Sequence, residues 1–191
     1  MAVNASAYFR LQVVGSLMQY EQSNHSPART SNKKEPFLLF RAGDTSFAVA
    51  AHRVEHLLEN PVFTPIDTEP DWLAGLLHLP QTTAPAIDLR RYFDITCQGP
   101  PRVAITVRLP FSSGGQLVAL LADRLLATEK IAPRELRPLR AANAKARFRQ
   151  FGVKTWRGRS RPCYVLEPDS LFSRASFSHL EHWWRTIWPA G

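Results

Sequence analysis

Cysteine is scarce in this chain: Cys97 and Cys163 are the only two in 191 residues. Small secreted domains that depend on disulfides carry a denser cysteine framework than this. Neither cysteine has the CxxC spacing that is typical of zinc or redox sites. We therefore expect both to be small buried residues, and two cysteines agree with a reducing compartment.

Long apolar runs are also lacking. No stretch reaches the roughly 18 to 20 continuous apolar residues of a membrane span. The most apolar segment near the start, residues 8–17, is interrupted by Arg10 and Gln12. No basic run precedes this segment and no small-residue cleavage site follows it, so it does not resemble a secretory signal. With 45% hydrophobic and 21% charged residues, the composition is typical of a soluble globular domain, and we expect a cytoplasmic protein.

The signatures of common enzyme classes are missing. The sequence has no glycine-rich phosphate loop, no GxSxG elbow and no dinucleotide-binding fingerprint. His179 and His182 are three positions apart, but no third metal ligand accompanies them. The best-placed carboxylates, Asp88 and Asp123, are interpreted as a helix cap and a turn residue at the end of a strand. Because no nucleophile, base and orienting group can be assembled, we predict a protein that is not an enzyme, with no cofactor and no metal.

What the sequence does contain is a series of short strand patterns separated by turns. Apolar residues at 37–40 and 47–49 flank the turn Ala42-Gly43-Asp44, and the alternation over 103–109 is the clearest strand signal in the chain. Further strands are expected at 116–122 and 161–167. Many short strands with few helices predict an all-β fold.

One helix is expected within this all-β pattern, over residues 70–79. Trp72, Leu73, Leu76 and Leu77 have the i, i+1, i+4, i+5 spacing of a helical face. Gly75 lies inside this segment, where close approach of another backbone would explain a glycine, and the following proline ends the pattern. A second, short helix is expected after its cap, Asp88.

Both ends of the chain differ from this central part. Residues 1–35 show no sustained hydrophobic period, and from residue 22 onward they are polar and rich in turn formers, so we expect them to be disordered. Residues 174–191 predict a helical tail whose apolar face packs against the body or contacts a partner or a membrane surface. That face consists of Leu180, Trp183, Trp184, Ile187 and Trp188.

Positive charge is concentrated in one stretch. Residues 134–161 contain ten lysines and arginines, and Glu135 is the only acid among them. The stretch is interpreted either as a solvated loop or as a surface for a polyanion. Because Phe148, Phe151 and Trp156 are interleaved with these charges, binding of nucleic acid is an alternative function.

From Phe37 to Phe172 the chain resembles the CheW-like domain of chemotaxis coupling proteins. Four segments carry the resemblance: FLLFRAGDTSFAVAAHRVEHLLE, DWLAGLLHLPQTTAPAIDLRRYF, LVALLADRLLATEKI and FGVKTWRGRSRPCYVLEPDSLF. The second contains Pro85, Ile87, Asp88, Leu89 and Arg90, which agree with the family pattern P-V-I-D-L-R. The resemblance implies a domain over residues 36–173 that consists of two small five-stranded SH3-like barrels packed side by side.

The resemblance also implies a function. The family's proteins are scaffolds that link the regulatory domain of a CheA-type histidine kinase to the cytoplasmic tips of chemoreceptors, and the receptor is held in a groove between the barrels. The residues that would contribute to partner binding here are Val54, His56, Gly75, Leu77, His78, Leu79, Pro80 and Arg90. We expect substitutions at Gly75 or Arg90 to weaken partner binding without unfolding the protein.

The chain departs from the family pattern at one turn. The family's N-L-R-G is His78-Leu79-Pro80-Gln81 here, so that Pro80 replaces a charged arginine and His56 aligns with its acidic partner. Charged groups at an interface determine much of the choice of partner. This departure favours a divergent array, such as one that serves surface or pilus-based motility, or a paralogue that has lost its partners.

Overall fold

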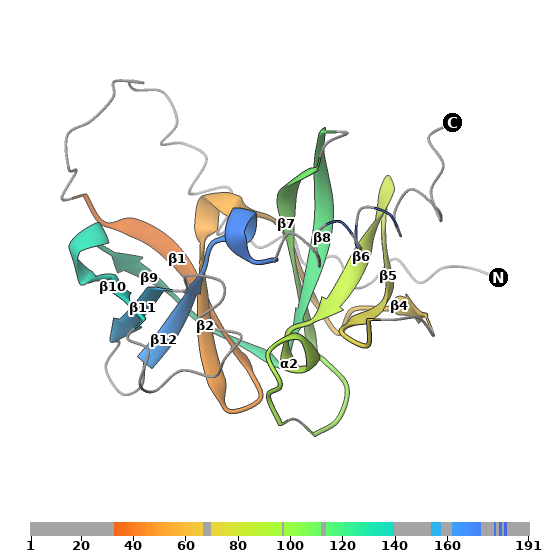
Figure 1. Ribbon diagram of the computed structural model, residues 1–191, viewed down its shortest axis with the longest axis horizontal. Helices are drawn as coiled ribbons and strands as arrows, with labels where there is room; N and C mark the ends of the chain where they lie inside the picture. The colour runs from red at the N-terminus through yellow and green to blue at the C-terminus, as the bar shows by residue number, and fades with distance from the viewer. Residues whose placement is uncertain are drawn as a thin grey trace.

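The computed structural model describes residues 33–66, 70–96, 98–111, 114–139, 154–157 and 162–172, together with residues 178, 180 and 182. These residues form two six-stranded sheets that lie side by side (Figure 1). The predicted all-β fold is confirmed. Each sheet has six strands instead of the expected five, and each includes a very short strand, β10 (Arg137–Pro138) or β4 (Phe63–Pro65).

The first sheet is assembled from both ends of the described chain. Its strand order is β10, β11 (Lys154–Arg157), β12 (Pro162–Leu166), β2 (Thr45–Ala50), β1 (Glu35–Ala42) and β9 (Arg124–Ile131). The hairpin of β1 and β2 pairs Ala42 with Thr45 across its turn, as expected. β12 adds to β2 in parallel, which brings the segment after residue 162 beside the start of the domain.

The second sheet is formed by the middle of the chain. Its order is β3 (Val54–Glu59), β7 (Val103–Phe111), β8 (Gly114–Ala122), β6 (Thr82–Asp88), β5 (Leu73–Leu79) and β4. The chain enters this sheet through a single 3-10 turn, η2 (Ala51–Arg53), and leaves it at Asp123, between β8 and β9. The two crossings between the sheets are therefore short.

The largest core cluster joins the two sheets. Phe40 and Phe47 contribute from the first sheet and Ile105 and Leu120 from the second, and all four are fully buried. Tyr92 packs into the same cluster from α2 (Leu89–Tyr92), and its hydroxyl donates a 2.9 Å hydrogen bond to the Leu171 carbonyl oxygen. Two smaller clusters lie on the opposite faces of the sheets, so most strands bury residues on both sides.

The helix predicted over residues 70–79 is wrong. This segment is strand β5, and it pairs with β6 on one side and β4 on the other. Leu77 belongs to the second sheet's own cluster, whereas Leu76 packs against the large shared cluster. A strand that is covered on both faces has consecutive apolar residues, and these imitated a helical stripe.

The other local predictions are confirmed where the structure describes them. Asp88 caps α2, because its Oδ1 accepts a 2.9 Å hydrogen bond from the Arg90 backbone N–H. Cys163 is buried, and burial raises the pKa of its thiol to about 12. After β12, residues 168–170 form a 3-10 turn, η5 (Pro168–Ser170). Within the described part, no helix is long and apolar enough to cross a membrane.

Several predictions fall largely outside the described residues. These concern the segment before residue 33, Cys97, most of the basic stretch and most of the C-terminal tail. Within the tail, residues 178, 180 and 182 are helical, and Leu180 is fully buried in the large shared cluster.

Candidate functional site: a charged pocket between the two sheets

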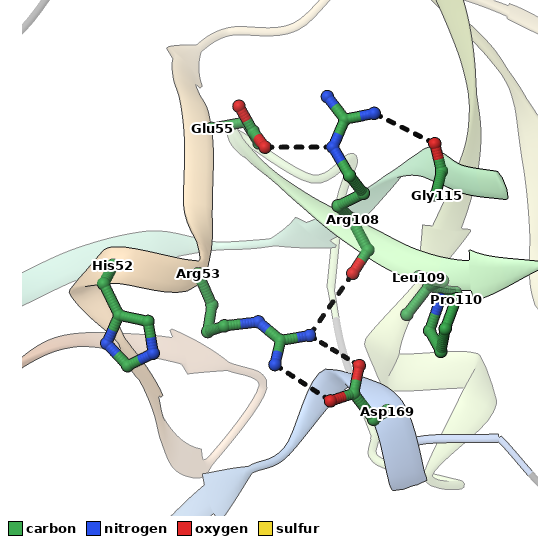
Figure 2. Close-up of a pocket in the computed structure, with 8 residues that line it drawn as sticks. All are labelled: His52, Arg53, Glu55, Arg108, Leu109, Pro110, Gly115 and Asp169. Carbon is green, nitrogen blue, oxygen red and sulfur yellow. Dashed lines mark hydrogen bonds and ion pairs between the residues drawn. The ribbon is translucent and has the colours of Figure 1, made fainter. Parts of the chain in front are cut away.

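An open pocket of about 500 Å³ lies where the two sheets meet. One wall comes from η2 and the start of β3, a second from the ends of β7 and β8, and a third from η5 (Figure 2). The pocket therefore depends on the first crossing of the chain, at η2, and on the return of the chain after β12. Its lining residues are His52, Arg53, Glu55, Arg108, Leu109, Pro110, Gly115 and Asp169.

An ion pair between Arg53 and Asp169 closes one side of this pocket. The two guanidinium Nη atoms donate to the two carboxylate oxygens at 2.9 and 2.5 Å, which is a bidentate geometry (Figure 2). The hydrogen bond from Arg53 lowers the pKa of Asp169, and the same bond raises the pKa of Arg53. The Asp169 side chain is 55% exposed, so solvent screens this pair and its contribution to stability is small.

A second ion pair lies on the other side of the pocket. Arg108 donates from Nε to Glu55 Oε1 at 3.1 Å and from Nη1 to the Gly115 carbonyl oxygen at 2.9 Å (Figure 2). The backbone oxygen of Arg108 also accepts a 3.4 Å hydrogen bond from Arg53. Arg108 is the outward-facing residue of the β7 alternation, which explains why it reaches the surface while Val107 and Leu109 are buried.

The pocket has hydrogen-bond donors to spare. A guanidinium carries five N–H groups, whereas the described hydrogen bonds number three for Arg53 and two for Arg108. A ligand that supplies acceptor oxygens, such as a carboxylate or a run of backbone carbonyls, is the chemical match for this surface. Among the described residues, no group of His, Cys, Asp and Glu side chains could hold a metal ion.

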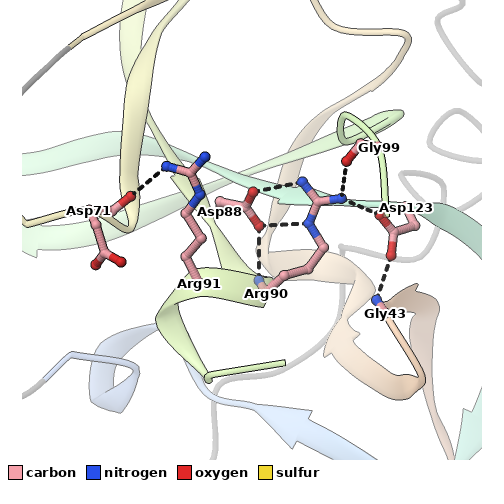
Figure 3. Close-up of polar contacts among 7 residues, drawn as sticks. All are labelled: Gly43, Asp71, Asp88, Arg90, Arg91, Gly99 and Asp123. Carbon is pink, nitrogen blue, oxygen red and sulfur yellow. Dashed lines mark hydrogen bonds and ion pairs between the residues drawn. The ribbon is translucent and has the colours of Figure 1, made fainter. Parts of the chain in front are cut away.

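At the second crossing between the sheets, Arg90 forms a buried network. Its Nη2 donates to Asp88 Oδ2 and its Nη1 to Asp123 Oδ1, both at 2.7 Å, and Nη1 also donates to the Gly99 carbonyl oxygen (Figure 3). The other Asp123 oxygen accepts a hydrogen bond from the Gly43 backbone N–H in the β1–β2 turn. Arg90 thus ties the second sheet to the first.

Four of the eight predicted partner-binding residues are accessible. His56, His78 and Pro80 are exposed and Val54 is partly exposed. Gly75, Leu77, Leu79 and Arg90 are buried, so their side chains present little surface to a partner.

The burial of Arg90 and Gly75 corrects the expectation that substitutions there would leave the fold intact. Arg90 is 3% exposed and its charge is balanced by two aspartates. A Cβ atom on Gly75 would lie 2.1 Å from the Thr64 carbonyl oxygen. The close backbone approach that was expected at Gly75 is present, but it belongs to the pairing of β5 with β4.

The accessible residues come from two strands of the second sheet and from one turn. Val54 and His56 are on β3, His78 is on β5, and Pro80 lies in the turn between β5 and β6. His56 Nδ1 lies 3.1 Å from Thr106 Oγ1 on β7, and His78 Nε2 lies 2.8 Å from Thr64 Oγ1 on β4. Each histidine therefore bonds to a threonine on the neighbouring strand, at a different edge of the sheet.

The sequence analysis missed the residues that line the pocket. Arg53 and Asp169 are 116 positions apart, and only the parallel pairing of β12 with β2 brings them together. The one local signal was Arg108, a charged residue at an outward position of a clear strand alternation.

The comparisons with known proteins agree with this architecture. A sequence model of the CheW-like domain matches residues 36–176. The chain therefore belongs to the CheW-like domain family. Protein FrzA of Myxococcus xanthus is 24% identical over 149 residues, which cover 78% of this chain and 91% of that protein.

A solved structure is similar in fold. The scaffolding protein TtCheW of Thermoanaerobacter tengcongensis superposes with a TM-score of 0.63 at 18% identity, and the match covers 73% of this chain and 93% of that one. CheW-like domains are adaptors of chemotaxis-type signalling, so this chain is an adaptor of that type.

Proposed function

We propose that this chain is a non-enzymatic cytoplasmic adaptor that couples chemoreceptors to a histidine kinase. The observation that carries the proposal is the family match over residues 36–176, which spans both sheets and both crossings between them. In this family the partners are the regulatory domain of a CheA-type kinase and the cytoplasmic tip of a receptor. An adaptor needs two separate surfaces, and the described residues offer candidates for both.

The receptor tip would dock at the pocket between the sheets. The pocket is lined by strands of the second sheet and by the turns η2 and η5, which follow strands of the first sheet, and its two arginines have unused donors. Side-chain carboxylates and carbonyl oxygens on the tip of a helical hairpin would supply the acceptors.

The kinase regulatory domain would contact the second sheet around the turn that follows β5. His78 and Pro80 are exposed there, and Leu77 and Leu79 hold the turn in place from the core. Proline has no backbone N–H to donate and no charge, so position 80 would offer a partner shape and apolar contact and no ion pair. The replacement of the family's charged arginine by Pro80 supports the proposal that the partner is a kinase of a divergent array, such as one for surface motility.

A pull-down with the full chain as bait tests the proposal. Nuclease-treated lysate of the host is passed over the tagged chain at physiological salt, and the proteins retained are identified by mass spectrometry. We expect a histidine kinase with a CheW-like regulatory domain, or a chemoreceptor, to be retained. A bait with the substitution Arg53→Glu should retain less receptor and the same amount of kinase.

Two results would contradict the proposal. Retention that occurs only in a parallel lysate without nuclease, and that falls steeply with salt, would indicate nucleic-acid binding through the basic stretch instead. Failure to retain any signalling protein, with a correctly folded bait, would indicate a paralogue without these partners.

A further inference from the structure

Two arginines face each other across β1 and β9. Arg41 and Arg124 are directly opposed in the register of these antiparallel strands. Like charges in this position repel each other and destabilise a sheet. Arg41 Nε donates a 3.0 Å hydrogen bond to the Gly43 carbonyl oxygen, but among the described residues no carboxylate is ion-paired with either arginine.

A third arginine is close to this pair. Arg102 and Arg124 line the same pocket of about 290 Å³, which Gln98, Pro100 and Asp123 complete. Arg102 and Arg124 are both exposed. We refer to Arg41, Arg102 and Arg124 as the arginine cluster.

Asp123 does not neutralise the arginine cluster. One of its oxygens accepts from Arg90 and the other from the Gly43 backbone N–H (Figure 3). With Asp88 and Asp123 each carrying a negative charge and Arg90 a positive one, the buried network has a net charge of about −1, against three positive charges in the cluster. In the same network Arg90 Nη1 donates to the Gly99 carbonyl oxygen. This hydrogen bond fixes the loop that forms one wall of the smaller pocket.

An exposed leucine lies beside the arginine cluster. The register of β1 and β9 passes from Leu39–Ala127 to Phe40–Leu125 and skips Leu126, which marks a β-bulge. Leu126 is 41% exposed and is one of two large hydrophobic residues exposed in the described part. Bulges on edge strands redirect side chains, and β9 is the last strand in the order of its sheet. The bulge therefore presents an apolar contact two positions from Arg124.

We propose that the arginine cluster and Leu126 form a docking site for an acidic segment of a partner protein. The carboxylates of the segment would bind Arg102 and Arg124, and an apolar side chain next to them would pack on Leu126. Arginine combined with an apolar anchor is a frequent composition of protein interfaces. The site is separate from the pocket of Arg53 and Asp169, and it does not depend on the kinase or the receptor as partners.

A protein partner fits this surface better than nucleic acid does. Single-stranded nucleic acids bind proteins that offer aromatic side chains for stacking along a basic groove. The exposed large hydrophobics in the described part are Val62 and Leu126, and neither is aromatic. The small pocket with its two arginines suits a pair of carboxylates rather than the extended phosphate backbone of a nucleic acid.

The test uses the full chain, labelled with nitrogen-15, and a short peptide that alternates glutamate and leucine. Binding is followed through the backbone amides and the arginine Nε–H signals. We expect saturable shifts at Gln98, Gly99, Arg102 and residues 124–127, and an affinity at least about tenfold lower for the double variant Arg102→Ala, Arg124→Thr. The melting temperature of that variant should stay the same or rise, because the repulsion between Arg41 and Arg124 is removed.

The matched control is the double variant Arg134→Ala, Arg137→Ala. It removes the same charge from exposed arginines in the basic stretch, and the peptide should bind it with an affinity within about twofold of the parent chain. An equal loss in both double variants would overturn the proposal, because it would show that only net charge matters. Tighter binding of a DNA oligonucleotide than of the peptide, through the same amides, would also overturn it.

A second peptide tests the contribution of Leu126. A peptide of glutamate and serine should bind more weakly than the leucine peptide, and equal binding of the two peptides would show that Leu126 is not part of the site.

Discussion

Arg90 donates a 2.7 Å hydrogen bond to Asp123 across the crossing from the second sheet to the first. With Asp88 on its other side, the guanidinium is enclosed between two carboxylates and only 3% exposed. A buried charge of this kind is tolerated because it is paired and hydrogen-bonded. The arrangement makes Arg90 a structural residue of the junction.

Replacement of Arg90 should therefore destabilise the protein. Arg90→Ala leaves Asp88 buried without its partner, and we expect the free energy of unfolding to fall by about 3 kcal/mol or more. Arg91→Ala is the control, because the neighbouring arginine is exposed and donates only to the Asp71 carbonyl oxygen. Its cost should stay below about 1 kcal/mol. Urea denaturation followed by circular dichroism measures both, and equal costs would contradict the structural role.

Gly75 should not tolerate a side chain. A Cβ atom there would meet the Thr64 backbone, and the φ angle of +155° is one that other residues rarely adopt. We expect Gly75→Ala to cost about 3 kcal/mol or more by combining strain with a clash. Gly99→Ala is the comparison, since that glycine also has a positive φ, of +74°, but has open space around it. Its cost should be about 1 kcal/mol in the same urea experiment, and the reverse ranking would contradict the pairing of β4 with β5.

Only part of the fold could be predicted from the sequence. The hairpin of β1 and β2, the strand β7 and the cap at Asp88 followed from local patterns, because each depends on residues close together in the chain. Strand β5 did not, because both of its faces are covered and its period of two was hidden. The long strand β9 was also missed as a strand, since six of its eight residues are exposed and give no apolar alternation.

The pocket could not be predicted at all. Arg53 and Asp169 have no local pattern in common, and their ion pair exists only because β12 adds in parallel to β2. His56 and His78 were predicted to contribute to partner binding, which stays a prediction, and their placement on β3 and β5 depends on the strand order.

The ion pair between Arg53 and Asp169 should be visible in a pH titration. The hydrogen bond from Arg53 lowers the pKa of Asp169 below its ordinary value of 3.8. Since the folded pKa is lowered, the stabilisation is present above the unfolded pKa and is lost as the pH falls through the folded pKa. Carbon-13 spectra of the carboxylate should show a midpoint that rises in Arg53→Ala and stays unchanged in Arg108→Ala. An unchanged midpoint in Arg53→Ala would mean that the pair is absent in solution.

Cys163 should be unreactive in the folded protein. Its thiol pKa of about 12 leaves almost no thiolate at pH 8. In the background of Cys97→Ser, a disulfide reagent should modify Cys163 only as fast as the protein unfolds, and at once in denaturant. Above about pH 9 the unfolded chain loses this proton before the folded protein does, so stability should decline from there toward pH 12. Rapid modification at pH 8 without denaturant would contradict the burial of Cys163.

The central claim is that the chain is an adaptor with two separate partner surfaces. The most direct test is a calorimetric titration of the purified chain with the regulatory domain of a histidine kinase from the same host, repeated with the receptor tip already bound. We predict saturable binding at physiological salt that persists when the receptor tip is present. The substitution Arg53→Glu should weaken the receptor tip's binding and leave the kinase domain's affinity unchanged. Absence of kinase binding by the folded chain, or competition between the two partners for one surface, would contradict the account.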